Sequence, residues 1–424
     1  MPKELLPCKM EKSSAIKIIK MNKATLFLFL LFPLTSTNAI ELTGRTSMLG
    51  STAQATQGDI GYINKNTLLT SDQQSLRLML DDTNDKNEWS VHLKIARQHL
   101  SGIPFNDKHP SDLFRYNTLS YDWLNENETS NATRLGYEVD RAFYKQSFKK
   151  MSFVIGRQAV DWGNGRFWQP LNVFGAFSPT DLDTDYKQGI DALRFNWFPS
   201  DFSSLTAVYA FSPNDSATIK KQTNSALYFR RQIGEESDYA LLAGTITGYQ
   251  IIGASFESAW SGMGWRVESA YYNDTNTNND FTFSIAGLDY QINNETIITA
   301  EWYNNSRGAS TVSAITNPTI DLFSQYGLQP QLSQNVLGVS INRVLTPLIN
   351  GTYTLLVSPL QNTNGTLNSS LLHQFNLIYS VSNESELLLS FLWGSGRGLN
   401  LSGKTQSEFG HVPVSLSMRL RFYF

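Results

Sequence analysis

The sequence predicts an all-β fold, a single transmembrane antiparallel β-barrel of about 18 strands. Three observations support this prediction. Many short segments alternate apolar and polar residues, no stretch after residue 39 approaches the ~20 consecutive apolar residues of a membrane helix, and the connections between segments alternate in length. A chain without apolar helices crosses lipid only as a closed barrel, because closed ladders satisfy every backbone polar group.

The N-terminus is predicted to be a cleavable signal peptide. Lys23 precedes a short apolar core at 24–34, and small residues up to Ala39 allow cleavage after that residue. Residues 1–20 are unusual for a signal and form an upstream extension if Met21 is the true start. The predicted domains are therefore a signal peptide, 1–39, and one barrel, 40–424.

Charge and cysteine content exclude several classes of protein. The chain has 34 basic and 37 acidic residues, and removal of the signal, which holds six lysines and two glutamates, leaves 28 and 35. This acidic balance does not fit a nucleic-acid partner. The only cysteine, Cys8, lies in the predicted signal, so the mature chain has no disulfide or thiolate metal site. No cofactor is expected.

The last segment is the clearest strand. From Val414 to Phe424, apolar residues at every second position alternate with serine, arginine and tyrosine, as in a strand with one apolar and one polar face. The same alternation recurs upstream, with apolar residues predicted to face lipid. The predicted strands are 41–53, 72–82, 88–98, 136–148, 151–160, 190–199, 202–212, 223–233, 237–247, 249–260, 263–273, 280–291, 294–305, 333–345, 347–358, 370–382, 384–396 and 412–424.

Long and short connections between the predicted strands alternate regularly from the first strand to the last. In such barrels both termini face the periplasm, periplasmic turns are short, and extracellular loops are longer. One predicted extracellular connection, Gly248, is very short. If 237–247 and 249–260 are one broken element, the count falls to 16 strands. Residues 114–123 are a candidate for an additional strand within their loop, outside the count of 18.

The C-terminal strand resembles the signature by which bacterial outer-membrane barrels are recognised for assembly, with Phe422 and Phe424 as the assembly signal. The layout also resembles that of general and substrate-specific porins, in which the third extracellular loop narrows the lumen. Segment 156–170, with its G-R-Q, W-G and P elements, is similar to a pattern of some proteobacterial outer-membrane barrels. The resemblance implies the bacterial outer membrane as location. It implies outer-membrane lipid, lipopolysaccharide and the barrel assembly machinery as partners.

The third extracellular loop, 161–189, carries the candidate constriction residues Trp162, Arg166, Phe167, Trp168, Asp181, Asp183 and Asp185. So many aromatic side chains need a place to be buried. Inside the lumen they would narrow it; against an external cap or a neighbouring subunit they would not. The D-x-D-x-D run is a candidate Ca²⁺ site, although no metal is assigned. The other interpretations are a solvated acidic loop, pairing of its carboxylates with Arg166 and Lys187, and attachment of the loop to the wall by these carboxylates.

Strand alternation places charged residues on the lumen wall. The basic ones are Arg77, Lys94, Arg194, Arg230, Arg266, Arg419 and Arg421, and the acidic ones are Asp81, Glu257, Glu268 and Glu301. An excess of basic residues on the lumen wall favours the passage of anions over cations. Alternatively the charges cancel in pairs, such as Arg266 with Glu268.

These features predict a passive porin-like channel for small polar or anionic solutes. The alternative functions are an export or assembly barrel that partners a periplasmic apparatus and a barrel-embedded hydrolase. A homo-oligomer is an alternative to a monomer. The sequence has no H-E-x-x-H zinc spacing and no G-x-S-x-G turn, so no enzyme is predicted.

Overall fold

The computed structural model describes residues 40–62, 65–101, 122–123, 132–211, 224–274, 279–315 and 329–424. The predicted signal peptide lies outside these residues, and 40–424 form one compact unit. None of the described segments is a helix long and apolar enough to cross a membrane.

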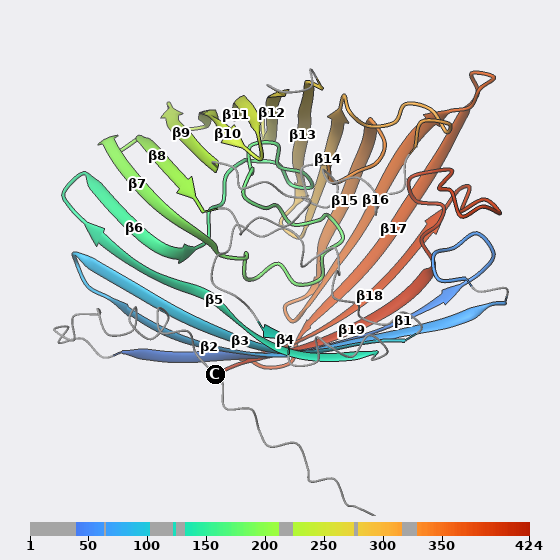
Figure 1. Cartoon of the computed structure of the whole chain (residues 1–424), viewed down its shortest axis with the longest axis horizontal. Helices are drawn as coiled ribbons and strands as arrows, with labels where there is room; N and C mark the ends of the chain where they lie inside the picture. Colours follow the sequence, from blue (N-terminus) through green and yellow to red (C-terminus); the bar gives the residue numbers. More distant parts are fainter. Residues whose placement is uncertain are drawn as a thin grey trace, which may run out of the picture. The chain divides into compact units, whose positions relative to one another are not determined.

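The unit is a closed antiparallel barrel (Figure 1). Neighbours in sequence pair in order around the wall, and the last strand pairs with the first to close it. The strands are β1 (Glu41–Ala55), β2 (Thr67–Thr83), β3 (Asn87–Leu100), β4 (Asp122–Trp123), β5 (Thr133–Ser147), β6 (Met151–Gln158), β7 (Ile190–Ser200), β8 (Ser203–Ala210), β9 (Asn224–Ile233), β10 (Ser237–Ile246), β11 (Tyr249–Trp260), β12 (Met263–Asp274), β13 (Phe281–Asn293), β14 (Thr296–Asn305), β15 (Asn335–Thr346), β16 (Ile349–Gln361), β17 (Leu367–Ser380), β18 (Ser385–Ser395) and β19 (Val414–Tyr423).

The described wall has 18 strands, which confirms the prediction. Strand β3 pairs directly with β5, while the two-residue β4 only adds to the edge of β5, so β4 is not a wall strand. The rest of the strand expected within 114–123 lies outside the described residues. The 16-strand alternative is wrong, because β10 and β11 are separate strands joined by Thr247 and Gly248. Both turn residues have positive φ, 50° and 88°, which suits a two-residue hairpin.

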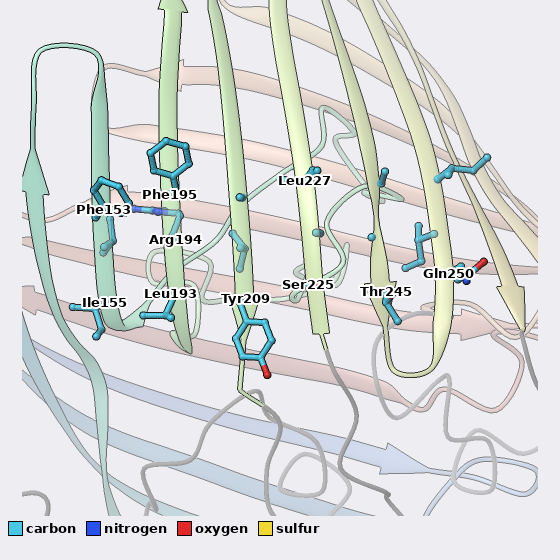
Figure 2. A pocket seen from close by; sticks show the side chains of 18 of the residues that line it. Phe153, Ile155, Leu193, Arg194, Phe195, Tyr209, Ser225, Leu227, Thr245 and Gln250 are labelled. Carbon is cyan, nitrogen blue, oxygen red and sulfur yellow. The ribbon is translucent and has the colours of Figure 1, made fainter.

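The wall has an apolar outer face. On β19, Val414, Leu416 and Met418 are about half exposed, while Arg419 and Arg421 on the other face are buried. A groove of about 1110 Å³ lies on β5–β11 among apolar side chains such as Phe153, Tyr209 and Leu227 (Figure 2). Because Phe153 and Leu227 face outward and are about half exposed, we assign this groove to the lipid-facing belt rather than to a solute path.

The closing seam depends on the terminal phenylalanine. Gly44 and Phe424 exchange two backbone hydrogen bonds, of 2.7 and 3.0 Å, beyond the β1–β19 ladder. The Phe424 ring covers Gly44, where an added Cβ would lie 2.3 Å from it. Deletion of Phe424 is therefore expected to leave unfolded protein in the periplasm. The check is heat-modifiable mobility of the membrane fraction, and assembled barrel at wild-type yield would count against an assembly role.

The two faces of one strand are expected to differ in tolerance to charge. On β16, Tyr353 faces outward and donates or accepts a 2.7 Å hydrogen bond with His373, while Thr352 faces the lumen and accepts one from Asn342. An arginine on the lipid face near mid-membrane costs roughly 2–4 kcal/mol. Tyr353→Arg should therefore lower the yield of folded barrel much more than Thr352→Arg. Equal yields would mean that the strand is out of register by one residue.

Candidate channel constriction

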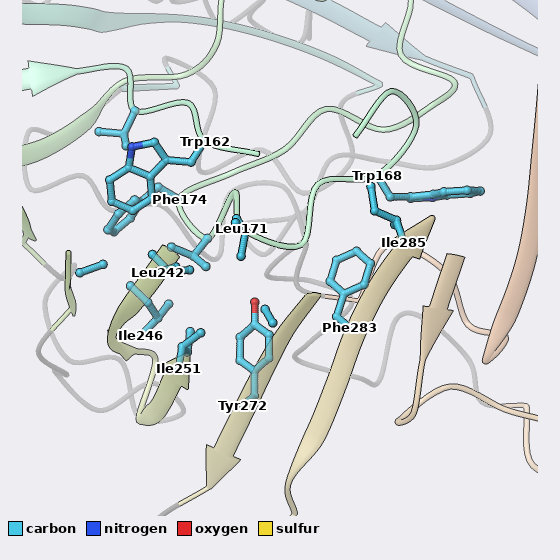
Figure 3. Packing of buried hydrophobic residues seen from close by; sticks show 14 of the residues in the cluster. Trp162, Trp168, Leu171, Phe174, Leu242, Ile246, Ile251, Tyr272, Phe283 and Ile285 are labelled. Carbon is cyan, nitrogen blue, oxygen red and sulfur yellow. The ribbon is translucent and has the colours of Figure 1, made fainter. Parts of the chain in front are cut away.

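The segment that joins β6 to β7 lies inside the barrel (Figure 1). Trp162 stacks on Tyr228 of β9, with ring centroids 4.9 Å apart and planes at 7°. Trp168, only 1% exposed, packs on Tyr303 of β14 at 5.1 Å. Figure 3 shows these loop side chains against inward-facing residues of the wall. The aromatic residues are thus buried within the barrel itself.

Two wall carboxylates bind the loop backbone. Glu301 of β14 accepts hydrogen bonds from the amides of Arg166, Phe167 and Trp168, at 2.9, 3.0 and 2.9 Å. Glu268 of β12 accepts two more, from the amides of Asn164 (2.7 Å) and Leu171 (2.6 Å). Both glutamates are buried, and hydrogen bonds to a charged acceptor are stronger than neutral ones. This part of the loop is therefore fixed to the wall.

Glycines of the wall make room for the loop. A Cβ added to Gly253 of β11 would lie 2.4 Å from Leu171, and one added to Gly338 of β15 would lie 3.0 Å from Phe167. Only a wall residue without a side chain permits such a close approach.

The second half of the loop binds another arc of the wall. Asp183 pairs with Arg45 of β1 at 2.8 Å, and Asp185 pairs with Arg45 at 2.9 Å and with Arg421 of β19. The carbonyl of Thr180 accepts a hydrogen bond from Gln374 of β17 at 3.2 Å. One loop thus contacts β9–β15 with its first half and β17, β19 and β1 with its second half.

The arrangement of Asp181, Asp183 and Asp185 does not match a Ca²⁺ site or the expected pairing with Arg166 and Lys187. Asp181 accepts a hydrogen bond from the Ser178 amide, apart from the other two, and among the described residues no three potential ligands gather around a metal position. The expected partners are elsewhere as well. Arg166 pairs with Asp289 at 3.2 Å, and Lys187 pairs with Asp161 at 2.5 Å.

The predicted wall residues face inward, and most are buried. Arg77, Arg266, Glu268, Glu301, Arg419 and Arg421 are buried, Lys94 and Arg194 are half-buried, and the Arg230 side chain is 49% exposed. The expected pair of Arg266 with Glu268 is wrong. Arg266 binds Asp289 and lies 3.5 Å from Glu301, whereas Glu268 is occupied by loop amides.

Several interacting residues were missed from the sequence. Arg45, Asp289 and Glu386 stood on inward faces of predicted strands and were overlooked, although alternation could have found them. Asp140 and Arg141 were hidden by a bulge in β5, where the register shifts opposite His92 and Leu93. A bulge changes the alternation of faces, so the sequence period alone cannot locate it.

A second loop also folds inward, and the sequence did not reveal it. In the segment between β18 and β19, Phe409 joins the same interior cluster as the constriction loop. Glu408 next to it accepts hydrogen bonds from the amides of Leu332 (2.9 Å) and Ser333 (2.6 Å). Burial raises the pKa of Glu408 and lowers that of His411 in the same segment. The loops that precede β15 and β19 are therefore joined to each other at one end of the barrel.

A closed antiparallel barrel with an apolar outer belt and a loop folded into its interior is the architecture of a transmembrane β-barrel. No family model matches the sequence, and no curated protein matches it.

Several solved structures share this fold. The chain is similar to OccAB4 of Acinetobacter baumannii, with a TM-score of 0.57, 11% identity, and 91% of this chain and 98% of that chain covered. It is also similar to OccD3 (OpdP) of Pseudomonas aeruginosa, with a TM-score of 0.53, 10% identity, and 92% of each chain covered. A third is OpdK of the same organism, solved with vanillate, with a TM-score of 0.54, 9% identity, and 91% and 98% covered. At such identities the likeness shows the fold.

Proposed function

We propose that the protein is a passive channel for small polar or anionic solutes, with residues 161–189 as its constriction. The observation that carries this proposal is the fixation of this loop inside the lumen by five backbone hydrogen bonds to Glu268 and Glu301. A lumen wide enough for water but crossed by an ordered loop retains only a narrow path, which selects solutes by size and charge.

Arginines supply the anion preference. The guanidinium groups of Arg141 and Arg194 donate to the backbone carbonyls of Lys187 and Ala159, each at 3.3 Å. Neither positive charge is therefore neutralised by a directly hydrogen-bonded carboxylate in the described part of the chain. Such groups attract an anion in a narrow aqueous pore.

The exposed constriction residue is Arg166. Its side chain is 59% exposed, and it shares the single carboxylate of Asp289 with Arg266. Because more than half of the Arg166 side chain is exposed, its guanidinium group can attract a passing anion. OpdK, whose structure contains vanillate, an aromatic carboxylate, supports an anionic solute class for this fold.

Planar-bilayer recording in a salt gradient tests the proposal. The wild-type protein should give discrete conductance steps and a reversal potential of the sign for anion preference. Arg166→Glu should move the reversal potential toward cation preference. Lys149→Glu makes the same charge change at an exposed periplasmic turn and serves as the control. An electrically silent barrel, or equal shifts in the two variants, would contradict the proposal.

A further inference from the structure

The closing seam between β1 and β19 has contacts from inside the barrel that the ladder does not provide. Asp183 binds Arg45 of β1 through two hydrogen bonds of 2.8 Å and lies 3.8 Å from Arg421 of β19. Asp185 binds Arg45 at 2.9 Å, pairs with Arg421, and accepts a hydrogen bond from the Tyr423 hydroxyl. Each carboxylate thus contacts both strands of the seam.

Neighbouring contacts extend this arrangement to both sides. The ring of Tyr186 lies under two guanidinium groups, 4.9 Å from Arg45 of β1 and 4.2 Å from Arg77 of β2. On β18, Glu386 accepts hydrogen bonds from Arg419 (3.0 Å) and Arg421 (2.5 Å). Residues 183–186 therefore lie at the centre of a network that reaches from β18 across the seam to β2.

We propose that residues 183–186 act as an internal brace that holds the first and last strands of the barrel together, a role separate from solute passage. The proposal rests on the seam contacts alone and does not depend on the channel function.

The brace has a physical reason. Seam residues Arg45 and Tyr423 come from opposite ends of the barrel domain, and the entropy cost of closing a loop grows with its length. Asp183 is 138 residues from Arg45 in the sequence, and Asp185 is 238 residues from Tyr423. Contacts with 183–186 therefore divide the long chain segment between β1 and β19 into two shorter segments, each of which closes separately. Arg45 and Arg421 are nearly buried, with side chains 3% and 8% exposed, so their charges need these carboxylates.

Thermal unfolding of the folded barrel tests the brace. The double variant Asp183→Asn with Asp185→Asn keeps the side-chain size but removes both charges from the seam arginines. Loss of a partner from a nearly buried ion pair is strongly destabilising. We therefore expect the half-time for loss of the heat-modifiable band at a fixed temperature to fall by about tenfold or more. The matched control is Asp181→Asn, in the same acidic run, whose carboxylate accepts a hydrogen bond from the Ser178 amide.

A covalent seam separates the brace from a general effect of the loop. Ser51 of β1 and Ser417 of β19 are paired across the seam, with their hydroxyl oxygens 2.6 Å apart. Ser51→Cys with Ser417→Cys should form a disulfide between paired strands. The disulfide between positions 51 and 417 should restore the heat resistance of the Asp183→Asn, Asp185→Asn variant. Reduction of this disulfide should make the variant heat-sensitive again.

Two results would overturn the brace. One is a double variant that unfolds at the rate of wild type and of Asp181→Asn. The other is a destabilised double variant that the oxidised seam does not rescue. If the double variant yields no folded barrel, it is made with the cysteine pair, and recovery only under oxidising conditions supports the brace, whereas no recovery contradicts it. Conductance of the same samples reports on the channel function independently.

Discussion

Deletion of residues 164–186 is expected to raise the single-channel conductance several-fold and to weaken ion selectivity. This segment contains the amides bound by Glu268 and Glu301 and the carboxylates bound by Arg45 and Arg421. Its removal takes the loop out of the lumen and exposes the wall arginines to water. The 18-strand wall is formed by strand pairing, but the deletion also removes the brace at 183–186, so the β1–β19 seam is made covalent in this experiment.

Planar-bilayer recording of the purified barrel measures this effect. The oxidised Ser51→Cys, Ser417→Cys seam provides the background in which the shortened chain is kept closed. Conductance equal to that of the full chain would mean that the ion path does not run past the loop.

Glu301→Leu is expected to release the constriction without removing it. The substitution leaves the amides of Arg166, Phe167 and Trp168 without their acceptor in a buried site. Each unpaired buried amide costs about 1–3 kcal/mol, so the loss of all three acceptor contacts lowers the stability of the bound loop by several kcal/mol. The loop should detach, and the open-channel current should become larger and noisier.

The control for this variant is Glu257→Leu. Glu257 lies on the same inner face of the wall, but it forms a 3.7 Å ion pair with the half-exposed Arg230 rather than a contact with the loop. Its current should resemble that of wild type. Identical currents in Glu301→Leu and Glu257→Leu would show that the carboxylate of Glu301 does not hold the loop.

The strands were predictable because each one carries its own signal. Side chains alternate with a period of two, so a segment such as Val414 to Phe424 reveals both its conformation and its outward face without knowledge of its neighbours. The short turn at Gly248 was ambiguous only because its left-handed backbone is not visible in the sequence.

The site was less predictable because its contacts join distant parts of the chain. Glu268 and Glu301 were recognised as wall charges, but their role as acceptors for loop amides depends on residues 97 to 135 positions away. Gly253 and Gly338 gave no sign that they admit Leu171 and Phe167. Likewise, nothing near Asp183 indicates Arg45 as its partner, since the two are 138 residues apart.

The most direct measurement of the constriction is the effect of chemical modification at position 166 on the current through a single channel. The only cysteine, Cys8, precedes the predicted cleavage position, so Arg166→Cys is the single thiol of a mature chain. Reaction with a bulky thiol reagent should lower the current at once, because the 59% exposed Arg166 side chain borders the path. Leu401→Cys, at a fully exposed position of the loop before β19, should react without changing the current. An unchanged current after complete modification at position 166 would contradict a constriction formed by this loop.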